Sequence, residues 1–288
     1  MPVSYCEGDF LKTNDNNIAT EFPYLHGFSP EEQERLRQQA AYAEHSIYQN
    51  VNFSSVKKLL EVGCGVGAQS EIILRRFPKL KLVGIDLSDA QISMAKKRLE
   101  TLDFAKDRFS INKMNASKMT FESGSFDGAF LCWVLEHMPD PLRVLSEVRR
   151  VLIPGSTIIV NEVMNSSFFL EPYSPNVWQY WMSFNDYQSS IGGDPFIGMK
   201  LGNMLQSLGY KDIKTMPVTW HYDNRTPQKR KEQIEFWTDL LLSASEQLVK
   251  ANVVSQEIVD KARAELDKVA DDPNAVFHYT FMQAQATV

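Results

Sequence analysis

The hydrophobic and polar positions of the 288-residue chain alternate between the periods of strands and of helices. An apolar run over residues 58–62 ends in a glycine-rich turn and leads into a helical pattern over residues 68–74. A second apolar run over residues 81–85 leads into an amphipathic helix over residues 90–99. Strands that alternate with helices in this way predict an α/β fold with a parallel sheet.

The alternation continues to the end of the chain. Further strands are expected over residues 109–114, 126–132, 157–162, 215–220 and 277–282. A helix is expected over residues 141–152, between the strands at 126–132 and 157–162. We divide the chain into an N-terminal segment and helix (1–50), a core (51–165), an aromatic cap insertion (166–200) and a C-terminal part of the core (201–288), with a helical insertion at about 227–272.

The turn after the first strand indicates a nucleotide site. It carries three alternating glycines, Gly63, Gly65 and Gly67, and the helix that follows would present its N–H groups to a ligand. Asp86 ends the second strand, where a carboxylate can accept hydrogen bonds from both hydroxyls of a ribose.

Two classes of cofactor compete for this turn. Gly63, Gly65 and Ala68 satisfy the dinucleotide pattern G-x-G-x-x-G/A, which would indicate a nicotinamide or flavin enzyme. Glu61 favours a different ligand, because a carboxylate repels a pyrophosphate but attracts a ligand with an ammonium and a sulfonium. A nicotinamide oxidoreductase would also need a catalytic set such as Tyr-x-x-x-Lys, which the expected positions lack.

The run E-x-G-C-G-x-G at residues 61–67, followed by Asp86, resembles motif I and its successor in class I S-adenosylmethionine-dependent methyltransferases. The resemblance extends over about residues 57–162 and includes Leu135-Glu136-His137 and Pro154-Gly155. It implies a seven-stranded Rossmann-like sheet with an antiparallel last strand, helices on both faces and a helical cap. It also implies S-adenosyl-L-methionine as cofactor and methyl transfer as reaction.

The resemblance assigns cofactor-binding residues. Gly63 and Gly65 would lie against the methionine end, Glu61 would orient its ammonium directly or through water, and Asp86 would bind the ribose. Further residues that it implies are Gln69 for the methionine carboxylate or the ribose, Leu87 on the adenine, Gln91 at the ribose or adenine edge, Asn115, the Ala116 N–H and the Leu131 carbonyl. The family often has Asp where Asn115 stands, but Asn can also accept a hydrogen bond from the adenine amino group.

Tyr24 precedes a helix start, with Ser29 expected as N-cap, Pro30 in the first turn and Glu32 two residues later. Tyr-x-x-Gly before such a helix resembles the N-terminal lid of small-molecule methyltransferases, in which the tyrosine closes over the cofactor. A tyrosine packed on the edge of the core is the alternative.

An aromatic-rich segment from Phe168 to Phe196 follows the fifth strand. Some of its rings are expected to form the core of a helical cap, and the rest would line an apolar pocket for the methyl acceptor. Trp178 and Trp181 are the expected acceptor-binding rings. If the acceptor is a cationic amine, Glu162 or Glu171 is expected beside it.

Methyl transfer from a sulfonium depends mostly on placement in a dry pocket, and it needs a base only when the acceptor is not ionised. His137, just after the fourth strand, is the candidate base, with His221 and Glu162 behind it. A structural role for His137 is the alternative.

Composition limits the partners. The formal net charge is −6, and the basic blocks, such as Lys229-Arg230-Lys231, are no longer than three residues, which argues against nucleic acid. No apolar stretch is long enough to span a membrane, and the three cysteines show no metal spacing, so we expect a cytoplasmic protein without metal. We expect a small apolar or aromatic acceptor, and the helical insertion could make a homodimer contact. A relative that binds the cofactor without methyl transfer, such as a cyclase, would have the same cofactor residues.

Overall fold

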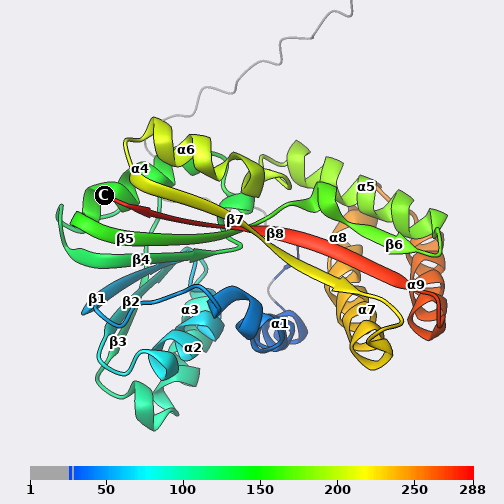
Figure 1. Cartoon of the computed structure of the whole chain (residues 1–288), viewed down its shortest axis with the longest axis horizontal. Helices are drawn as coiled ribbons and strands as arrows, with labels where there is room; N and C mark the ends of the chain where they lie inside the picture. Colours follow the sequence, from blue (N-terminus) through cyan, green and yellow to red (C-terminus); the bar gives the residue numbers. More distant parts are fainter. Residues whose placement is uncertain (1–25, 28) are drawn as a thin grey trace, which may run out of the picture.

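The computed structural model describes residues 26–27 and 29–288. Its core is an eight-stranded sheet in the order β3-β2-β1-β4-β5-β8-β6, with β7 paired to the opposite edge of β8 (Figure 1). The strands are β1 (Lys58–Val62), β2 (Lys81–Asp86), β3 (Phe109–Lys113), β4 (Phe126–Cys132), β5 (Leu152–Val163), β6 (Phe169–Glu171), β7 (Lys211–Tyr222) and β8 (Val276–Thr287). Strands β1 to β5 are parallel, and β8 is antiparallel to its neighbours.

The expected α/β fold with an antiparallel last strand is confirmed, and the sheet contains one strand more than expected. The sheet has eight strands rather than seven, because residues Phe169–Glu171 of the expected cap insertion form β6 on the edge of β8. The last two long strands, β7 and β8, have 12 residues each and are twice as long as the sequence pattern indicated.

Helices cover both faces of the parallel strands. Figure 1 shows α2 and α3 on one side of the sheet and α4 and α6 on the other. The helices are α1 (Pro30–Tyr48), α2 (Ala68–Arg76), α3 (Asp89–Glu100), α4 (Pro141–Val151), α5 (Pro175–Ser190), α6 (Leu201–Ser207), α7 (Pro227–Leu242), α8 (Ser245–Lys250) and α9 (Gln256–Asp271). The short 3-10 helices are η1 (Asp103–Ala105), η2 (Leu135–His137), η3 (Asn165–Ser167) and η4 (Ile197–Lys200). The insertion near 227–272 thus holds three helices, α7, α8 and α9.

The parallel strands are buried between two apolar layers. In β1, Leu59 belongs to the layer that contains α1, α2 and α3, and the next residue, Leu60, belongs to the layer that contains α4 and α6. A strand that is covered on both faces must be apolar at consecutive positions. This explains why residues 58–62 form a continuous apolar run rather than an alternating one.

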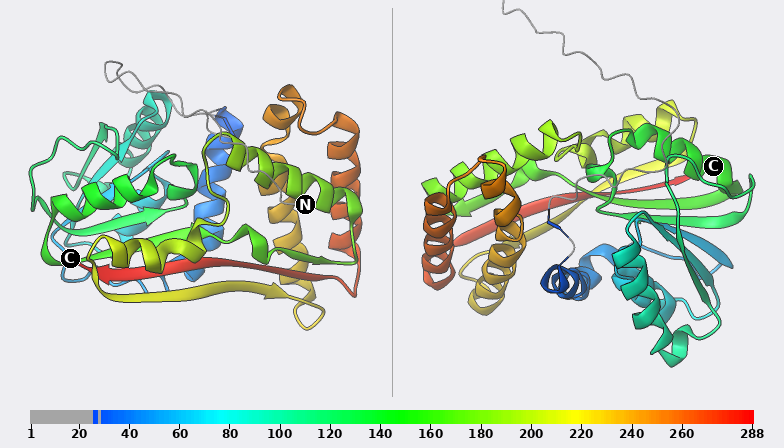
Figure 2. Two further views of the ribbon diagram at one scale, coloured as in Figure 1. Left: turned by 90° about the horizontal axis from the view of Figure 1, so that it is seen from above. Right: turned by 180° about the vertical axis from the view of Figure 1, so that it is seen from behind.

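β7 and β8 extend beyond the parallel strands and form the base of the cap (Figures 1 and 2). β8 pairs with β5 over residues 281–287 and with β6 over residues 276–278. Phe277, Tyr279 and Phe281, at every second position of β8, share one apolar cluster with residues of α5, α7 and α9. The helical cap is therefore built on an extension of the sheet.

The start of α1 agrees with the sequence prediction. Ser29 is the N-cap and its Oγ accepts a hydrogen bond from the Glu32 N–H (3.2 Å), with Pro30 in the first turn. Tyr24, the expected lid residue, lies outside the described residues. None of the helices in residues 26–27 and 29–288 is both long and apolar enough to cross a membrane.

Gly198 provides a test of how tightly the cap joins the sheet. A Cβ atom there would lie 2.6 Å from the Val163 carbonyl oxygen and 2.7 Å from that of Glu162, and neither backbone atom can move aside cheaply. We predict that Gly198→Ala lowers the free energy of unfolding by about 1–3 kcal/mol in denaturant titrations. Gly202→Ala is the control, because its Cβ would lie 3.4 Å from Thr215 Cγ2, in ordinary contact, and it should be neutral or slightly stabilising. Equal stability of the two variants would contradict this packing.

Candidate functional site

Three glycines form the turn between β1 and α2. Gly63, Gly65 and Gly67 have φ values of +69°, +49° and +77°, in the left-handed region that other residues rarely adopt. A Cβ atom at Gly63 would lie 2.3 Å from Val134 Cγ2, and one at Gly67 would lie 3.1 Å from Ala95 Cβ. A Cβ atom at Gly65 would meet nothing within 4 Å. The backbone at Gly65 is therefore open to a ligand.

Asp86 stands at the end of β2, beside this turn. Its Oδ2 accepts a hydrogen bond from the Gly65 N–H (2.9 Å), and its Oδ1 accepts one from the Ser88 N–H (3.0 Å). Burial raises the pKa of Asp86, and the hydrogen bonds from Ser88, Gly65 and Leu87 act in the opposite direction. The carboxyl group thus links the second strand to the glycine turn.

A cavity of about 270 Å³ opens beyond the carboxyl ends of β1, β2 and β4. Open α/β sheets generally bind their ligands at this end. One half of the cavity is lined by the glycine turn, Asp86 and residues of α1, α2 and α3, and we call it the cofactor half. The expected cofactor residues that line it are Gly63, Gly65, Gln69, Asp86, Leu87, Gln91 and Ala116.

Glu61 lies behind the glycine turn and does not line the cavity. Its side chain is buried in β1, where Ser70 Oγ donates a hydrogen bond to Glu61 Oε2. Burial raises the pKa of Glu61 to about 8. This placement does not support the direct contact with a ligand ammonium that the motif suggested.

Two other expected cofactor residues also lie outside the lining. The Asn115 side chain is engaged in a local turn, in which its Oδ1 accepts a hydrogen bond from the Ser117 N–H (2.8 Å), and the adjacent Ala116 lines the cavity instead. Leu131 lies inside β4, and it is the next residue, Cys132, that reaches the cavity.

The other half of the cavity, which we call the aromatic half, is walled by rings from separate parts of the chain. They are Trp133 after β4, Trp181 and Phe184 of α5, Trp220 of β7, Trp237 of α7 and Tyr279 of β8. The centroids of the Trp181 and Phe184 rings are 5.6 Å apart with the rings stacked, and those of Trp237 and Tyr279 are 4.6 Å apart. An apolar wall with few polar groups is typical of a small-molecule site.

Two residues expected at the acceptor site lie elsewhere. Trp178 does not line the cavity; its half-buried ring packs on Phe168 of the cap core, with centroids 5.5 Å apart. Glu162 is also a structural residue in this fold. Its carboxylate accepts hydrogen bonds from the N–H groups that open η2, those of Val134 (3.0 Å), Leu135 (2.8 Å) and Glu136 (3.3 Å). Glu162 therefore cannot serve as the carboxylate beside the acceptor, and burial, together with the charge of Glu136, raises its pKa to about 8.

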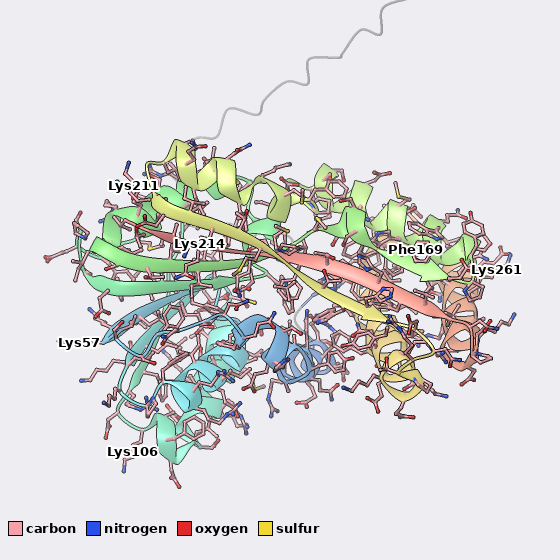
Figure 3. All side chains as sticks on the ribbon, in the orientation of Figure 1. Lys57, Lys106, Phe169, Lys211, Lys214 and Lys261 are labelled. Atoms are coloured by element: carbon pink, nitrogen blue, oxygen red, sulfur yellow. The ribbon has the colours of Figure 1, made fainter. Side chains whose placement is uncertain are left out.

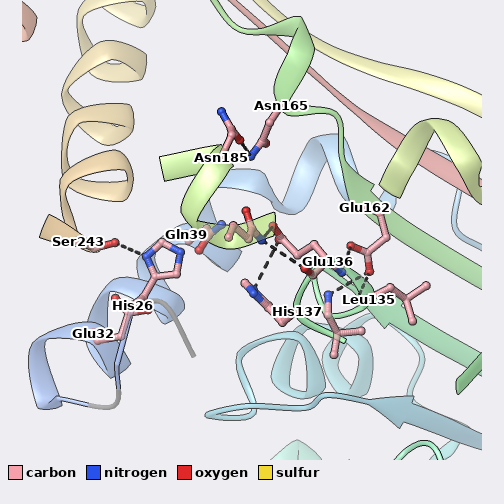
Figure 4. Close-up of polar contacts among 12 residues, drawn as sticks. His26, Glu32, Gln39, Leu135, Glu136, His137, Glu162, Asn165, Asn185 and Ser243 are labelled. Atoms are coloured by element: carbon pink, nitrogen blue, oxygen red, sulfur yellow. Dashed lines mark hydrogen bonds and ion pairs between the residues drawn. The ribbon is translucent and has the colours of Figure 1, made fainter. Parts of the chain in front are cut away.

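Polar groups gather where the two halves of the cavity meet (Figure 4). His137 Nε2 lies 3.7 Å from Glu136 Oε1, and both residues line the cavity. Gln188 Nε2 donates a hydrogen bond to Glu136 Oε2 (2.9 Å), which joins α5 to η2. His26 Nδ1 lies 2.6 Å from Ser243 Oγ, and burial lowers the pKa of His26 well below its ordinary value. His137 thus has a carboxylate beside it, as a base that must become charged would need.

The sequence prediction missed several lining residues. Trp133 directly follows the fourth strand, and its φ of +52° is rare for a bulky residue. Its place at a carboxyl strand end is a signal that could have been found. Arg35 and Gln39 of α1 also line the cavity, with the Arg35 guanidinium paired to Glu32 (2.6 Å) and to Gln39 Oε1 (2.9 Å).

Comparison with known proteins finds a similarity over part of the chain. Residues 60–160 match the family described as "Methyltransferase domain". Sterol 24-C-methyltransferase of Clavispora lusitaniae is 31% identical over 159 residues, which cover 53% of this chain and 42% of that protein. The chloroplastic tocopherol O-methyltransferase of Arabidopsis thaliana is 29% identical over 176 residues, covering 55% of this chain and 45% of the relative. This chain thus spans less than half the length of these two curated relatives.

Among solved structures, the [4+2]-cyclase SpnF shares the fold, with a TM-score of 0.51 at 18% identity over 87% of this chain and 80% of that one. The glycine turn and Asp86 both lie within residues 60–160, the region that matches the methyltransferase domain. S-adenosylmethionine is the cofactor of such a domain, and the open backbone at Gly65 beside the Asp86 carboxylate fits it. The dinucleotide alternative is therefore set aside.

Asp86 can be tested by cofactor binding. Asp86→Ala removes the charged acceptor expected for the ribose hydroxyls and should weaken S-adenosylhomocysteine binding by roughly 1–3 kcal/mol in calorimetric titrations. Asp89→Ala is the matched control, because Asp89 lies nearby in the first turn of α3 with its side chain 74% exposed and outside the lining. Unchanged affinity in Asp86→Ala would remove this residue from the cofactor site.

Glu61 predicts a pH dependence of stability. Its pKa is about 8 in the fold against an ordinary 4.5, so the folded state holds this proton more tightly than the unfolded chain. Unfolding then releases a proton between these values, and the free energy of unfolding falls with rising pH by up to about 1.4 kcal/mol per pH unit. Glu61→Gln should show a shallower fall between about pH 5 and 8 and be the more stable form at pH 8. Glu257→Gln is the control, because Glu257 is exposed on α9, and it should leave the pH dependence of the free energy of unfolding unchanged in this range. If Glu61→Gln also left this pH dependence unchanged, the raised pKa of Glu61 would be refuted.

Proposed function

We propose that this chain transfers a methyl group from S-adenosylmethionine to a small, apolar or aromatic acceptor. The observation that carries the proposal is one continuous cavity, with the glycine turn and Asp86 in one half and six aromatic rings in the other. The cofactor, when bound, supplies an electrophilic methyl group on a sulfonium. The protein's contribution is to hold the acceptor in line with that group and to exclude water.

The aromatic half favours an acceptor with a largely apolar body. Its rings come from α5, α7, β7, β8 and the end of β4. Among the described residues, Glu136 is the carboxylate that lines this part of the cavity. The curated relatives reported above are named for a sterol and for tocopherol, which supports a lipophilic acceptor. In Figure 3, the labelled Lys57, Lys106, Lys211 and Lys214 lie toward one end of the molecule, and Lys261 lies at the other end, in α9.

His137 is the proposed base when the acceptor carries an un-ionised hydroxyl or amine. Its imidazole would take the proton from the acceptor atom as the new bond to carbon forms. Glu136 Oε1, 3.7 Å from His137 Nε2, would stabilise the resulting imidazolium. The hydrogen bond from Gln188 fixes this carboxylate, so that the base and the cap are held together.

A protein that binds the cofactor without methyl transfer is the second candidate. The shared fold with a [4+2]-cyclase favours it only at the level of the fold, because one fold supports different reactions. Incubation with isotopically methyl-labelled S-adenosylmethionine and a panel of phenols, sterols and prenylated quinols separates the two. Label in an extracted product supports transfer, and tight S-adenosylhomocysteine binding without a labelled product from any class supports the alternative.

Trp181 and Trp178 form a matched pair for testing the aromatic half. Trp181→Ala removes a ring from the cavity wall and should raise the Michaelis constant of the acceptor about tenfold or more, with S-adenosylmethionine affinity nearly unchanged. Trp178→Ala removes the same kind of side chain from α5, but its half-buried ring packs on Phe168 outside the cavity. It should lower stability without changing the Michaelis constant. Equal effects of the two substitutions on the acceptor would contradict this location of the acceptor site.

A further inference from the structure

Asn165 is a buried polar residue in the wall of the aromatic half. It begins η3, two residues after the end of β5, and it lines the cavity. Its Oδ1 accepts a hydrogen bond from the Tyr279 hydroxyl (2.8 Å), and its Nδ2 donates one to Asn185 Oδ1 (2.7 Å; Figure 4). Its backbone carbonyl accepts a hydrogen bond from Trp181 Nε1 (3.2 Å), and its backbone N–H donates one to the Pro195 carbonyl (3.0 Å). One residue thus binds β8, α5 and the segment before η4.

The direction of these hydrogen bonds is fixed by a backbone group at one end. Asn185 Nδ2 donates to the Trp181 carbonyl (2.8 Å), and a carbonyl can only accept. Asn185 therefore turns its Oδ1 toward Asn165, which must answer with Nδ2, and the Asn165 oxygen is left for the Tyr279 hydroxyl. Burial raises the pKa of Tyr279 well above its ordinary value, so the hydroxyl keeps its proton and remains a donor.

Two rings of the aromatic half are held by this chain of hydrogen bonds. Trp181 comes from α5 and Tyr279 from β8, and among the described residues no hydrogen bond joins these two elements directly. Asn165 is therefore the polar link between them. The indole N–H of Trp181 and the hydroxyl hydrogen of Tyr279 are both bound to Asn165, so the two rings offer the cavity apolar surface rather than hydrogen-bond donors.

We propose that Asn165 is a positioning residue that fixes the Trp181 and Tyr279 rings as one preformed wall for the apolar body of the acceptor. The inference rests on the proposed function, because the aromatic half must receive the acceptor, and it adds the residue that sets how well an apolar body fits there. Rings that are ordered before binding lose less conformational freedom when the ligand arrives, so loss of the link should weaken acceptor binding. The glycine turn and Asp86 belong to other elements, so cofactor affinity should not change.

Binding of 2-naphthol tests the role of Asn165. This small, neutral and fluorescent phenol reports on the aromatic half without any need for methyl transfer. Asn165→Leu keeps a side chain of similar size but removes both of its side-chain hydrogen bonds. It should weaken 2-naphthol about three- to tenfold in fluorescence titrations and leave S-adenosylhomocysteine within about twofold in calorimetry. Unchanged 2-naphthol affinity, or an equal loss for both ligands, would overturn the assignment.

Tyr279→Phe tests the same link from β8. It keeps the ring and removes the hydroxyl, so it should also weaken 2-naphthol, with no further effect in an Asn165→Leu background. A further loss in the double variant would mean that the hydroxyl acts on the ligand directly, and it would overturn the role of Asn165. Tyr210→Phe is the matched control, because its buried hydroxyl donates to the Leu145 carbonyl (2.9 Å) outside the cavity. It should leave 2-naphthol affinity unchanged.

Nuclear magnetic resonance without a ligand gives a measurement that does not depend on the folding of Asn165→Leu. The Trp181 indole N–H signal, assigned by its absence in Trp181→Phe, should shift in Tyr279→Phe and stay in place in Tyr210→Phe. An unmoved signal in Tyr279→Phe would overturn the link. If the wild type bound no 2-naphthol, the acceptor site of the proposed function would fail and the inference with it, whereas binding that none of the variants changes would overturn the inference alone.

Discussion

The pairing of β8 with strands on both of its edges is the constraint on which the aromatic half of the site depends. One edge of β8 pairs with β5 and then with β6, and the other edge pairs with β7 over residues 277–287 of β8. This continuous ladder carries Tyr279 and Trp220 from the sheet into the cap at adjacent positions, as the register Trp220↔Tyr279 shows. Without the extension, the helices α5, α7 and α9 would have no apolar face to cover.

Burial of acidic groups recurs around the site and has a structural cause. Glu61 lies behind the glycine turn, and Glu162 accepts three backbone N–H groups at the start of η2. Both have a pKa raised to about 8, because burial disfavours the charged form more than the hydrogen bonds favour it. Glu61 connects β1 to Ser70 of α2 across the glycine turn, and Glu162 fixes the loop that follows β4. This turn and this loop form the floor of the cavity.

The helix α1 has a function in the site that goes beyond covering the sheet. Arg35 and Gln39 of α1 line the cavity, and Tyr48 and Gln33 bind the oxygens of two cavity glutamines. A helix that comes before the glycine turn in the chain thus completes the cofactor half. The position of α1 therefore determines how the side-chain amides of Gln69 and Gln91 are oriented in the cavity, through the hydrogen bonds from Tyr48 and Gln33.

The sequence by itself determined the parallel core, the glycine turn, Asp86 and the capped start of α1, because these depend on local patterns: apolar runs, backbone conformations that only glycine adopts easily, and a side-chain oxygen three residues from the N–H it binds. The resemblance to methyltransferases added Gln69 and Gln91, and both line the cavity. It could not show that Glu61 and Glu162 are occupied by Ser70 and by backbone N–H groups, or that Trp181 rather than Trp178 reaches the cavity. The ring wall was decided by the tertiary structure alone. Trp220 and Tyr279 are far apart in the chain, and the β7–β8 pairing sets them opposite each other, since the register of distant strands leaves no local signal.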